Sequence, residues 1–160
     1  TEECGGNVHE KGIVIVESSS TSFSHGFDRK AHYAVDFEDD IHYFCSANSA
    51  GSWLKYNFKN KKVRPTHYSI KSTKYYGKGE YNLISWVIEG SNNDNDWIEL
   101  DNRQNIYDLD GINHVQTFYI QKILKPNEFF QYLRIRSTGK DSAGYNHILF
   151  SALEYFGSII

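Results

Sequence analysis

The side chains that could do chemistry in this 160-residue sequence are acids, amides and aromatic rings in polar segments, not a known catalytic set. There is no Gly-X-Ser-X-Gly elbow, no P-loop and no pair of histidines at helical spacing for zinc. His32, His42 and His67 each precede a tyrosine. Histidines in strand-like segments more often pack at an edge or in the core than bind a metal. We therefore predict a protein that is not an enzyme.

Residues 92–96, with the sequence Asn-Asn-Asp-Asn-Asp, place oxygen side chains at alternate positions. This spacing is that of the first half of a calcium-binding EF-hand loop. The glycine that such a loop needs for its sharp bend is replaced by Trp97, and no helical pattern flanks the segment. We therefore interpret it as a polar turn that leads into a strand.

Glu154 is a more informative acid, because the segment 148–156 is otherwise almost entirely apolar and is predicted to be a strand buried on both faces. An unpaired buried carboxylate costs on the order of several kcal/mol. The sequence leaves two possible partners that would neutralise the Glu154 carboxylate. The favoured one is Arg134 or Arg136, and the other is a calcium ion shared with Asp36 and Asp39.

The charge balance counts against nucleic acid as a partner, because a net charge of -3 gives no long-range attraction for a polyanion. The basic residues between 59 and 64 lie in a short polar link between two strand-like runs, where lysines usually keep a turn soluble. No apolar run approaches 18 residues, so no transmembrane segment is predicted. Because the sequence starts at Thr1 without an initiator methionine, we expect it to be part of a longer, multidomain chain.

The elements that must position these side chains are predicted to be short strands. Apolar and polar residues alternate over residues 52–58, 67–72 and 132–137, the period of a half-buried strand. Pro65 is expected to interrupt the run between the first two, and residues 32–40 are expected to be a helical turn or irregular. With 16% aromatic residues and no amphipathic helix, the chain is predicted to be a single all-β domain over residues 1–160. The predicted fold class is a jelly-roll β-sandwich of about eight antiparallel strands, with ligand-bearing loops at one end and Trp86 and Trp97 in its interior.

The order of several short motifs resembles that of a discoidin domain, also called the F5/8 type C domain, of the galactose-binding-like superfamily. The motifs are spread over nearly the whole chain. They are the serines at 18–20, the segments 52–58, 65–70 and 85–92, Trp97, and the segments 132–135, 138–139 and 153–157.

This resemblance implies a non-catalytic binding module that recognises carbohydrates, phospholipid head groups or proteins through loops at one end of the sandwich. Extracellular members of the family often join their two ends by a disulfide, but Cys4 has no counterpart near Ile160 and Cys45 lies mid-chain. The sequence is therefore most similar to the intracellular form found with BTB modules, which implies a cytoplasmic location. Calcium-binding relatives carry an Asp-Gly pair and a later threonine where this chain has Asp36-Phe37 and no threonine before Cys45, so only part of that site is kept.

Two functions follow from these expectations. The first is an interaction domain for a protein partner inside the cell, because exposed aromatic residues commonly anchor interfaces. Its hot spots are predicted at Phe23, Phe27, Tyr75 and Tyr76. The alternative is a lectin-like module for a neutral glycan, in which an aromatic ring stacks on a sugar face and polar side chains bond its hydroxyls. Its predicted contacts are His25, Arg29, Tyr75, Asn92, Asn93, Tyr145 and Asn146.

Overall fold

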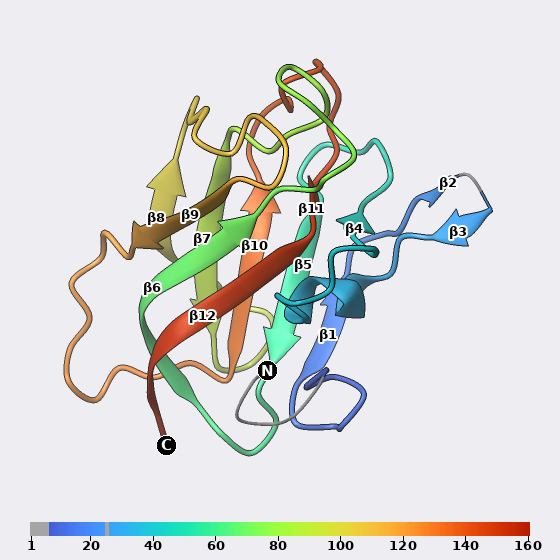
Figure 1. The fold of residues 1–160 in the computed structure, drawn as a ribbon. Coiled ribbons are helices and arrows are strands. Elements are labelled where there is room, and N and C mark those ends of the chain that lie inside the picture. Colours follow the sequence, from blue (N-terminus) through green and yellow to red (C-terminus); the bar gives the residue numbers. More distant parts are fainter. Residues whose placement is uncertain (1–6, 25) are drawn as a thin grey trace.

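The computed structural model describes residues 7–24 and 26–160, and in this part of the chain eight strands form two antiparallel sheets that pack face to face (Figure 1). The larger sheet has five strands in the order β1-β5-β10-β7-β8. Their bounds are β1 Ile15–Ser18, β5 Trp53–Asn57, β10 Tyr132–Ser137, β7 Trp86–Ser91 and β8 Ile98–Arg103. The predicted jelly-roll β-sandwich is confirmed.

The smaller sheet has three strands in the order β12-β6-β9. Its strands are β12 Ala152–Ile159, β6 Val63–Lys71 and β9 Val115–Tyr119. Shorter elements complete the fold: the pair β4 Phe44–Cys45 and β11 Leu149–Phe150, the hairpin β2 Phe23–Ser24 and β3 Phe27–Asp28, and the 3-10 helix η1 Ala31–Val35. The hairpin projects from the body of the sandwich (Figure 1). The helix covers the first part of the segment 32–40, which is predicted to be a helical turn or irregular, and residues 36–40 are irregular.

The core lies between the two sheets and is formed by the alternate residues of each strand. Leu54, Ile88 and Ile135 of the larger sheet face Ile70 and Leu153 of the smaller one, and all five are fully buried. Each such side chain stabilises the fold by about 1.5–3 kcal/mol relative to an exposed position. The alternation along each strand therefore accounts for the way the two sheets pack.

Polar groups also join the two sheets through the core. The hydroxyl of Tyr68 donates to Oδ2 of Asp101 at 2.6 Å and accepts a hydrogen bond from Nε1 of Trp86 at 2.8 Å. The hydroxyl of Tyr56 donates to the carbonyl oxygen of Leu153 at 2.6 Å. Each of these contacts crosses from one sheet to the other, so the buried polar atoms fix how the sheets are aligned.

The outer face of the larger sheet carries a charged network. Glu89 accepts hydrogen bonds from Nε of Arg134 at 2.6 Å and from a terminal nitrogen of Arg136 at 2.7 Å. The guanidinium of Arg134 also lies over the ring of Trp97, 3.9 Å from its centroid. The prediction for Trp86 is confirmed, since it is fully buried, but that for Trp97 is wrong. Trp97 instead stacks on Arg134 on the outer face of the larger sheet.

Two strand predictions also need correction. Strand β6 runs through Pro65, because its pairing with β12 shifts register between Phe156 and Gly157, with Thr66 of β6 as the extra residue next to the proline that offers no N–H to the ladder. A Cβ on Gly157 would lie 2.1 Å from the carbonyl oxygen of Arg64, so only glycine fits this crossing. The segment 148–156 is buried only as far as Leu153, and residues 154–156 are partly exposed on β12, which is an edge strand of its sheet. No helix of the described residues has the length and apolar character needed to span a membrane.

Candidate functional site

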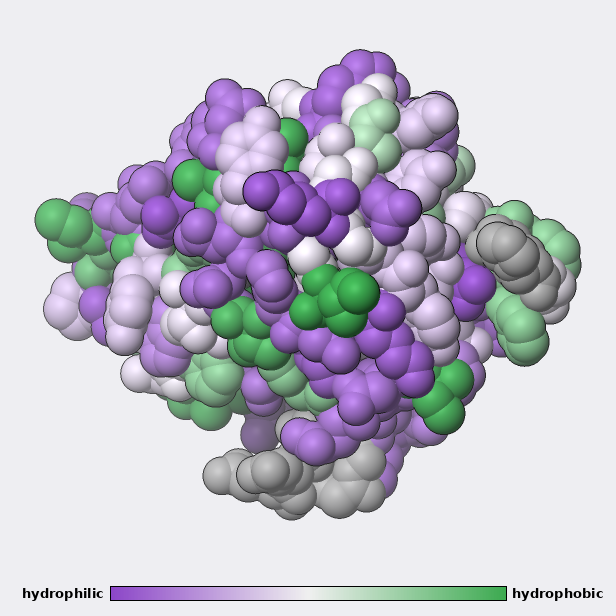
Figure 2. Space-filling model, turned by 45° about the horizontal axis from the view of Figure 1, so that its top comes forward, coloured by the Kyte–Doolittle hydropathy of each residue, from purple (hydrophilic) through white to green (hydrophobic). Residues whose placement is uncertain are grey.

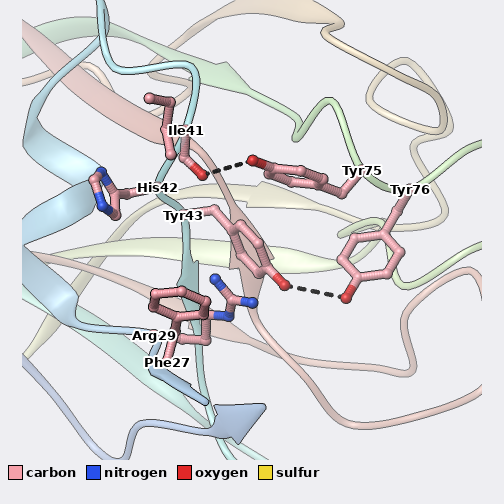
Figure 3. A pocket seen from close by; sticks show the side chains of 7 residues that line it. All are labelled: Phe27, Arg29, Ile41, His42, Tyr43, Tyr75 and Tyr76. Carbon is pink, nitrogen blue, oxygen red and sulfur yellow. Dashed lines mark hydrogen bonds between the residues drawn. The ribbon is translucent and has the colours of Figure 1, made fainter. Parts of the chain in front are cut away.

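Three segments that are far apart in the sequence enclose a pocket of about 530 Å³ beside the projecting hairpin (Figure 3). The segments are the hairpin with the residue that follows it, the chain between η1 and β4, and the loop between β6 and β7. We call this the tyrosine pocket. Its lining residues are Phe27, Arg29, Ile41, His42, Tyr43, Tyr75 and Tyr76. The hairpin is one of several separate hydrophobic areas on an otherwise mostly hydrophilic face (Figure 2).

Tyr43 forms the inner wall of the tyrosine pocket and is only 3% exposed. The guanidinium carbon of Arg29 lies 4.1 Å from the centroid of its ring, and 5.9 Å from that of Phe27. The aromatic face fixes the plane of the guanidinium stacked on it. Burial raises the pKa of the Tyr43 hydroxyl, which therefore stays protonated and can donate a hydrogen bond.

Tyr75 and Tyr76 form the opposite wall, and each is tied to the segment before β4. The hydroxyl of Tyr75 donates to the carbonyl oxygen of Ile41 at 3.0 Å. The hydroxyl of Tyr76 lies 3.1 Å from that of Tyr43 (Figure 3). These two links hold the loop between β6 and β7 against the segment between η1 and β4, so the pocket is held open in a defined shape.

Asp39 fixes the part of the wall that carries Ile41 and His42. Its Oδ1 accepts the backbone N–H groups of Ile41 at 2.8 Å and His42 at 3.0 Å, and its Oδ2 lies 2.6 Å from Nδ1 of His42. Burial acts to raise the pKa of Asp39, but the two backbone N–H groups and the imidazole outweigh it and hold that pKa below its usual value. The ionised carboxylate thus orients the His42 ring.

The hairpin is anchored to strand β4 directly behind the pocket. The N–H of Ser22 donates to the carbonyl oxygen of Cys45 at 2.8 Å, and the N–H of Cys45 approaches the carbonyl oxygen of Arg29 at 3.4 Å. Cys45 is a buried free thiol whose pKa is raised by burial. The base of the hairpin is therefore part of the folded body, although its tip projects.

Further aromatic rings continue the wall away from Tyr43. Tyr81 lies 5.2 Å from Tyr76 and 5.6 Å from Tyr145 between ring centroids, and Tyr145 is stacked 5.7 Å from His147. Tyr145 is 44% exposed. Its loop is rigid, because Oδ1 of Asp141 accepts the N–H groups of Ala143 and Tyr145 at 2.9 Å each. The rings form a row from the tyrosine pocket to the loop before β11.

Four of the predicted ligand contacts, Phe27, Arg29, Tyr75 and Tyr76, come together in the tyrosine pocket. Phe23 lies on the same hairpin but does not line the pocket, and it is 70% exposed. Tyr145 belongs to the aromatic row, whereas Asn146 lines a separate pocket. His25 lies outside the described residues, as does Cys4.

Asn92 and Asn93 lie at the opposite end of the sandwich, because β7 separates them from the loop that carries Tyr75 and Tyr76. The Asn92 carboxamide donates to the carbonyl of Phe129 and accepts the N–H of Gln131. The Oδ1 of Asn93 accepts the N–H of Asp96 at 2.8 Å, within its own turn. The segment is the polar turn that its sequence predicts, and both amides are used in holding it.

The acids predicted for calcium are not gathered into one group. Among the described residues no three His, Cys, Asp or Glu side chains cluster as metal ligands. Asp36 accepts the N–H of Glu38 in a local turn, and Asp39 is engaged with His42. Glu154 lies on β12, opposite Ser69.

The salt bridge predicted for Glu154 is also absent, because Arg134 and Arg136 point outward from the other sheet and share Glu89 instead. Leu133 and Ile135, the residues that alternate with them on β10, face the core. The two arginines therefore cannot reach a side chain of the smaller sheet. Glu154 is only half-buried, so the burial cost that motivated the prediction is smaller than expected.

Sequence reasoning missed Ile41, His42 and Tyr43. The available signal was weak: His42 and Tyr43 follow four acids at 36–40 in a segment without a clear period. The hydrogen bonds of Asp39 shape this segment locally. The contacts that place it in the pocket are long-range, because the Tyr75 hydroxyl donates to the Ile41 carbonyl and the Arg29 guanidinium stacks on Tyr43.

Several solved structures with the same fold are carbohydrate-binding modules. One is the module CpGH89CBM32-5 from Clostridium perfringens in complex with GalNAc-β-1,3-galactose, with a TM-score of 0.70 and 10% identity over 92% of this chain and 97% of that one. Another is the CBM62 from Clostridium thermocellum Xyl5A, with a TM-score of 0.66 and 19% identity over 90% and 94%. A third is the family 32 module from C. perfringens NanJ in complex with galactose, with a TM-score of 0.61 and 12% identity over 91% and 94%.

These similarities define the fold as the galactose-binding-like jelly roll, which such modules share with discoidin domains. No family model and no curated protein sequence matches the chain. The predicted fold is thus confirmed, and membership of the galactose-binding-like superfamily stays a prediction. The narrower resemblance to the BTB-associated form stays a prediction.

Proposed function

We propose that this protein is a non-catalytic carbohydrate-binding module that binds a neutral glycan in the tyrosine pocket. The observation that carries the proposal is the combination of ring faces with the polar groups of Arg29 and His42 around one hollow of about 530 Å³. That volume falls in the range of small-molecule sites, about 300–1,000 Å³.

The chemistry of the lining suits a sugar. A sugar ring presents C–H groups on its faces and hydroxyls around its rim, so it needs an aromatic surface and hydrogen-bonding groups side by side. Tyr75 is nearly half exposed and offers the aromatic surface. Arg29 and His42 offer hydrogen bonds, and none of the seven lining residues is an acid.

The structural neighbours support the same class of function. Among them are sugar complexes with GalNAc-β-1,3-galactose, with galactose and with 4,5-unsaturated mannuronic acid. A further neighbour contains a CBM32 and alginate lyase domains, and this chain covers 33% of it. A binding module attached to other domains is therefore the arrangement we propose for this chain as well.

A glycan array run on the purified chain tests the proposal. Saturable binding that is lost in Tyr75→Ala and kept in Tyr107→Ala is the expected result, because Tyr107 is exposed but does not line the tyrosine pocket. Repeating the array with calcium and with a chelator tests the calcium prediction independently. Absence of glycan binding by the intact chain would contradict the proposal.

A protein partner is the second candidate. Phe23 and Phe27 are 70% and 63% exposed on the hairpin, and Ile41 is 63% exposed next to it. Exposed apolar side chains of this kind are typical anchors of protein interfaces. The carbohydrate proposal is better supported, since the neighbours bind sugars. A defined protein complex that forms without any glycan and is lost in Phe23→Ala/Phe27→Ala would favour the second candidate.

A further inference from the structure

A second pocket lies on the other side of the loop that carries Tyr145. It has a volume of about 350 Å³ and is lined by residues 50–51 before β5, residues 136–140 at the end of β10, and Asn146. We call it the basic pocket. It shares no lining residue with the tyrosine pocket.

The charges around the basic pocket favour an anion. Arg136 and Lys140 line it, and none of its lining residues is an acid. Arg136 is paired with Glu89, but that carboxylate is shared with Arg134, so these three side chains keep one positive charge. The negative charge of Glu99 on β8 also attracts Arg136 and offsets part of this positive charge, so Lys140 is the main source of net positive charge at the pocket. Lys140 forms no ion pair with any described residue and is exposed at the pocket.

Uncharged hydrogen-bonding groups surround the same hollow. Oγ1 of Thr138 accepts a hydrogen bond from the carboxamide of Gln104 at 2.9 Å, which leaves its own hydrogen to be donated elsewhere. Within the described chain, the carboxamide of Asn146 makes no hydrogen bond. Both groups lie beside the two cations, so donors for an oxyanion and for neighbouring hydroxyls occur together.

The backbone that forms the basic pocket is held in place. The N–H of Ser137 donates to the carbonyl of Ser52 at 2.9 Å, and the N–H of Asn146 donates to Oδ1 of Asn48 at 2.8 Å. Gly51 has φ of 73°, and no atom lies within 4 Å of the position its Cβ would take. The glycine permits the turn and leaves that wall open. A ligand would meet a preformed site.

We propose that the basic pocket binds an acidic sugar, with Lys140 and Arg136 contacting a carboxylate or a sulfate ester and with Thr138 and Asn146 contacting ring hydroxyls. The ligand class follows from the cations together with the uncharged donors, because a bare anion site would not need the latter. This inference goes beyond the function proposed for the tyrosine pocket and does not depend on it.

Backbone amide signals recorded by two-dimensional NMR test the inference during titration with D-glucuronate, glucose 6-sulfate, glucose and inorganic sulfate. We expect saturable shifts at Gly139, Lys140 and Asn146 with one or both acidic sugars, and the preferred one distinguishes carboxylate from sulfate. Lys140→Ala should raise the dissociation constant about tenfold, the effect of one charged hydrogen bond. Lys122→Ala, which removes an exposed lysine outside the pocket, should leave it unchanged.

A second variant, Thr138→Val, keeps the shape of the side chain and removes its hydroxyl, so it should weaken the acidic sugars but not any response to inorganic sulfate. The inference is overturned if these amides do not respond, if glucose or inorganic sulfate matches the acidic sugars, or if Lys122→Ala has the same effect as Lys140→Ala. A glycan that binds only at Tyr75 would support the proposed function and would contradict the acidic-sugar site in the basic pocket.

Discussion

The guanidinium of Arg29 is stacked on the ring of Tyr43, with its central carbon 4.1 Å from the ring centroid. This contact joins the end of the hairpin to the residue that precedes β4. It gives the tyrosine pocket a cation whose position is set by an aromatic face, and not by a long flexible chain alone.

We predict that Arg29→Ala weakens glycan binding at least tenfold, because arginine in a well-packed pocket is a frequent hot spot. Arg29→Lys should recover only part of the loss, since the ammonium lacks the planar fork that stacks on Tyr43. Calorimetric titration with the best array ligand measures both. Lys30→Ala, which removes the exposed neighbouring cation, is the control and should bind normally.

Tyr68→Phe should destabilise the fold by about 1–3 kcal/mol, because it leaves the Trp86 N–H and a carboxylate oxygen of Asp101 without their shared partner. Urea denaturation followed by tryptophan fluorescence gives the free energy of unfolding. Tyr119→Phe is the matched control, since Tyr119 is 69% exposed. Equal stability of the two variants would mean that the buried hydroxyl contributes nothing.

Gly90→Ala should destabilise the sandwich by about 1–3 kcal/mol through overpacking. A Cβ at this position would lie 2.7 Å from two atoms of the Phe130 ring. Calorimetric Tm measures the effect. Gly77→Ala meets only the end of the Glu80 side chain at 3.4 Å and should leave Tm nearly unchanged. An unchanged Tm for Gly90→Ala would show that Phe130 can move aside freely.

Glu89 should make stability depend on pH in the acid range. Burial acts to raise its pKa, but the hydrogen bonds and charges of Arg136 and Arg134 outweigh it and lower that pKa from the usual 4.5. The carboxylate therefore contributes stability that is fully present above about pH 4.5 and is lost as the pH falls through its lowered pKa.

Glu89→Gln should accordingly be less stable than the parent at pH 7, and the difference should shrink on acidification. Thermal unfolding between pH 7 and pH 3 measures it. Glu10→Gln, at an exposed position, should follow the parent throughout. A constant difference between Glu89→Gln and the parent at every pH would contradict this account.

The β-sandwich fold could be predicted because the alternation of apolar and polar residues along a strand is a local sequence signal. Alternation along β10 places Leu133 and Ile135 inside, and the structure confirms it. The burial of Glu154 and its neighbours could not be predicted, because they depend on which sheet each strand joins. Four residues that line the tyrosine pocket, among them Arg29 and Tyr75, are predicted ligand contacts, and their role in binding stays a prediction.

The positions of the other predicted contacts required the fold itself. Nothing local distinguishes Asn92, which serves its own turn, from Asn146, which lines the basic pocket. Both are asparagines in polar loops. Their different environments follow from the strands that place them at opposite ends of the sandwich, and sequence periodicity does not encode that pairing.

Because the Cys45 thiol is buried, its rate of chemical modification reports local opening of the structure around the hairpin. In a Cys4→Ser background, we expect an aromatic disulfide reagent to react with Cys45 when strand β4 separates locally from its neighbours, the hairpin among them. The rate of modification would then report the frequency of that opening. A ligand that bridges the hairpin and Tyr43 should slow the reaction in proportion to its occupancy. Binding could thus be followed by labelling kinetics, without a dye on the ligand.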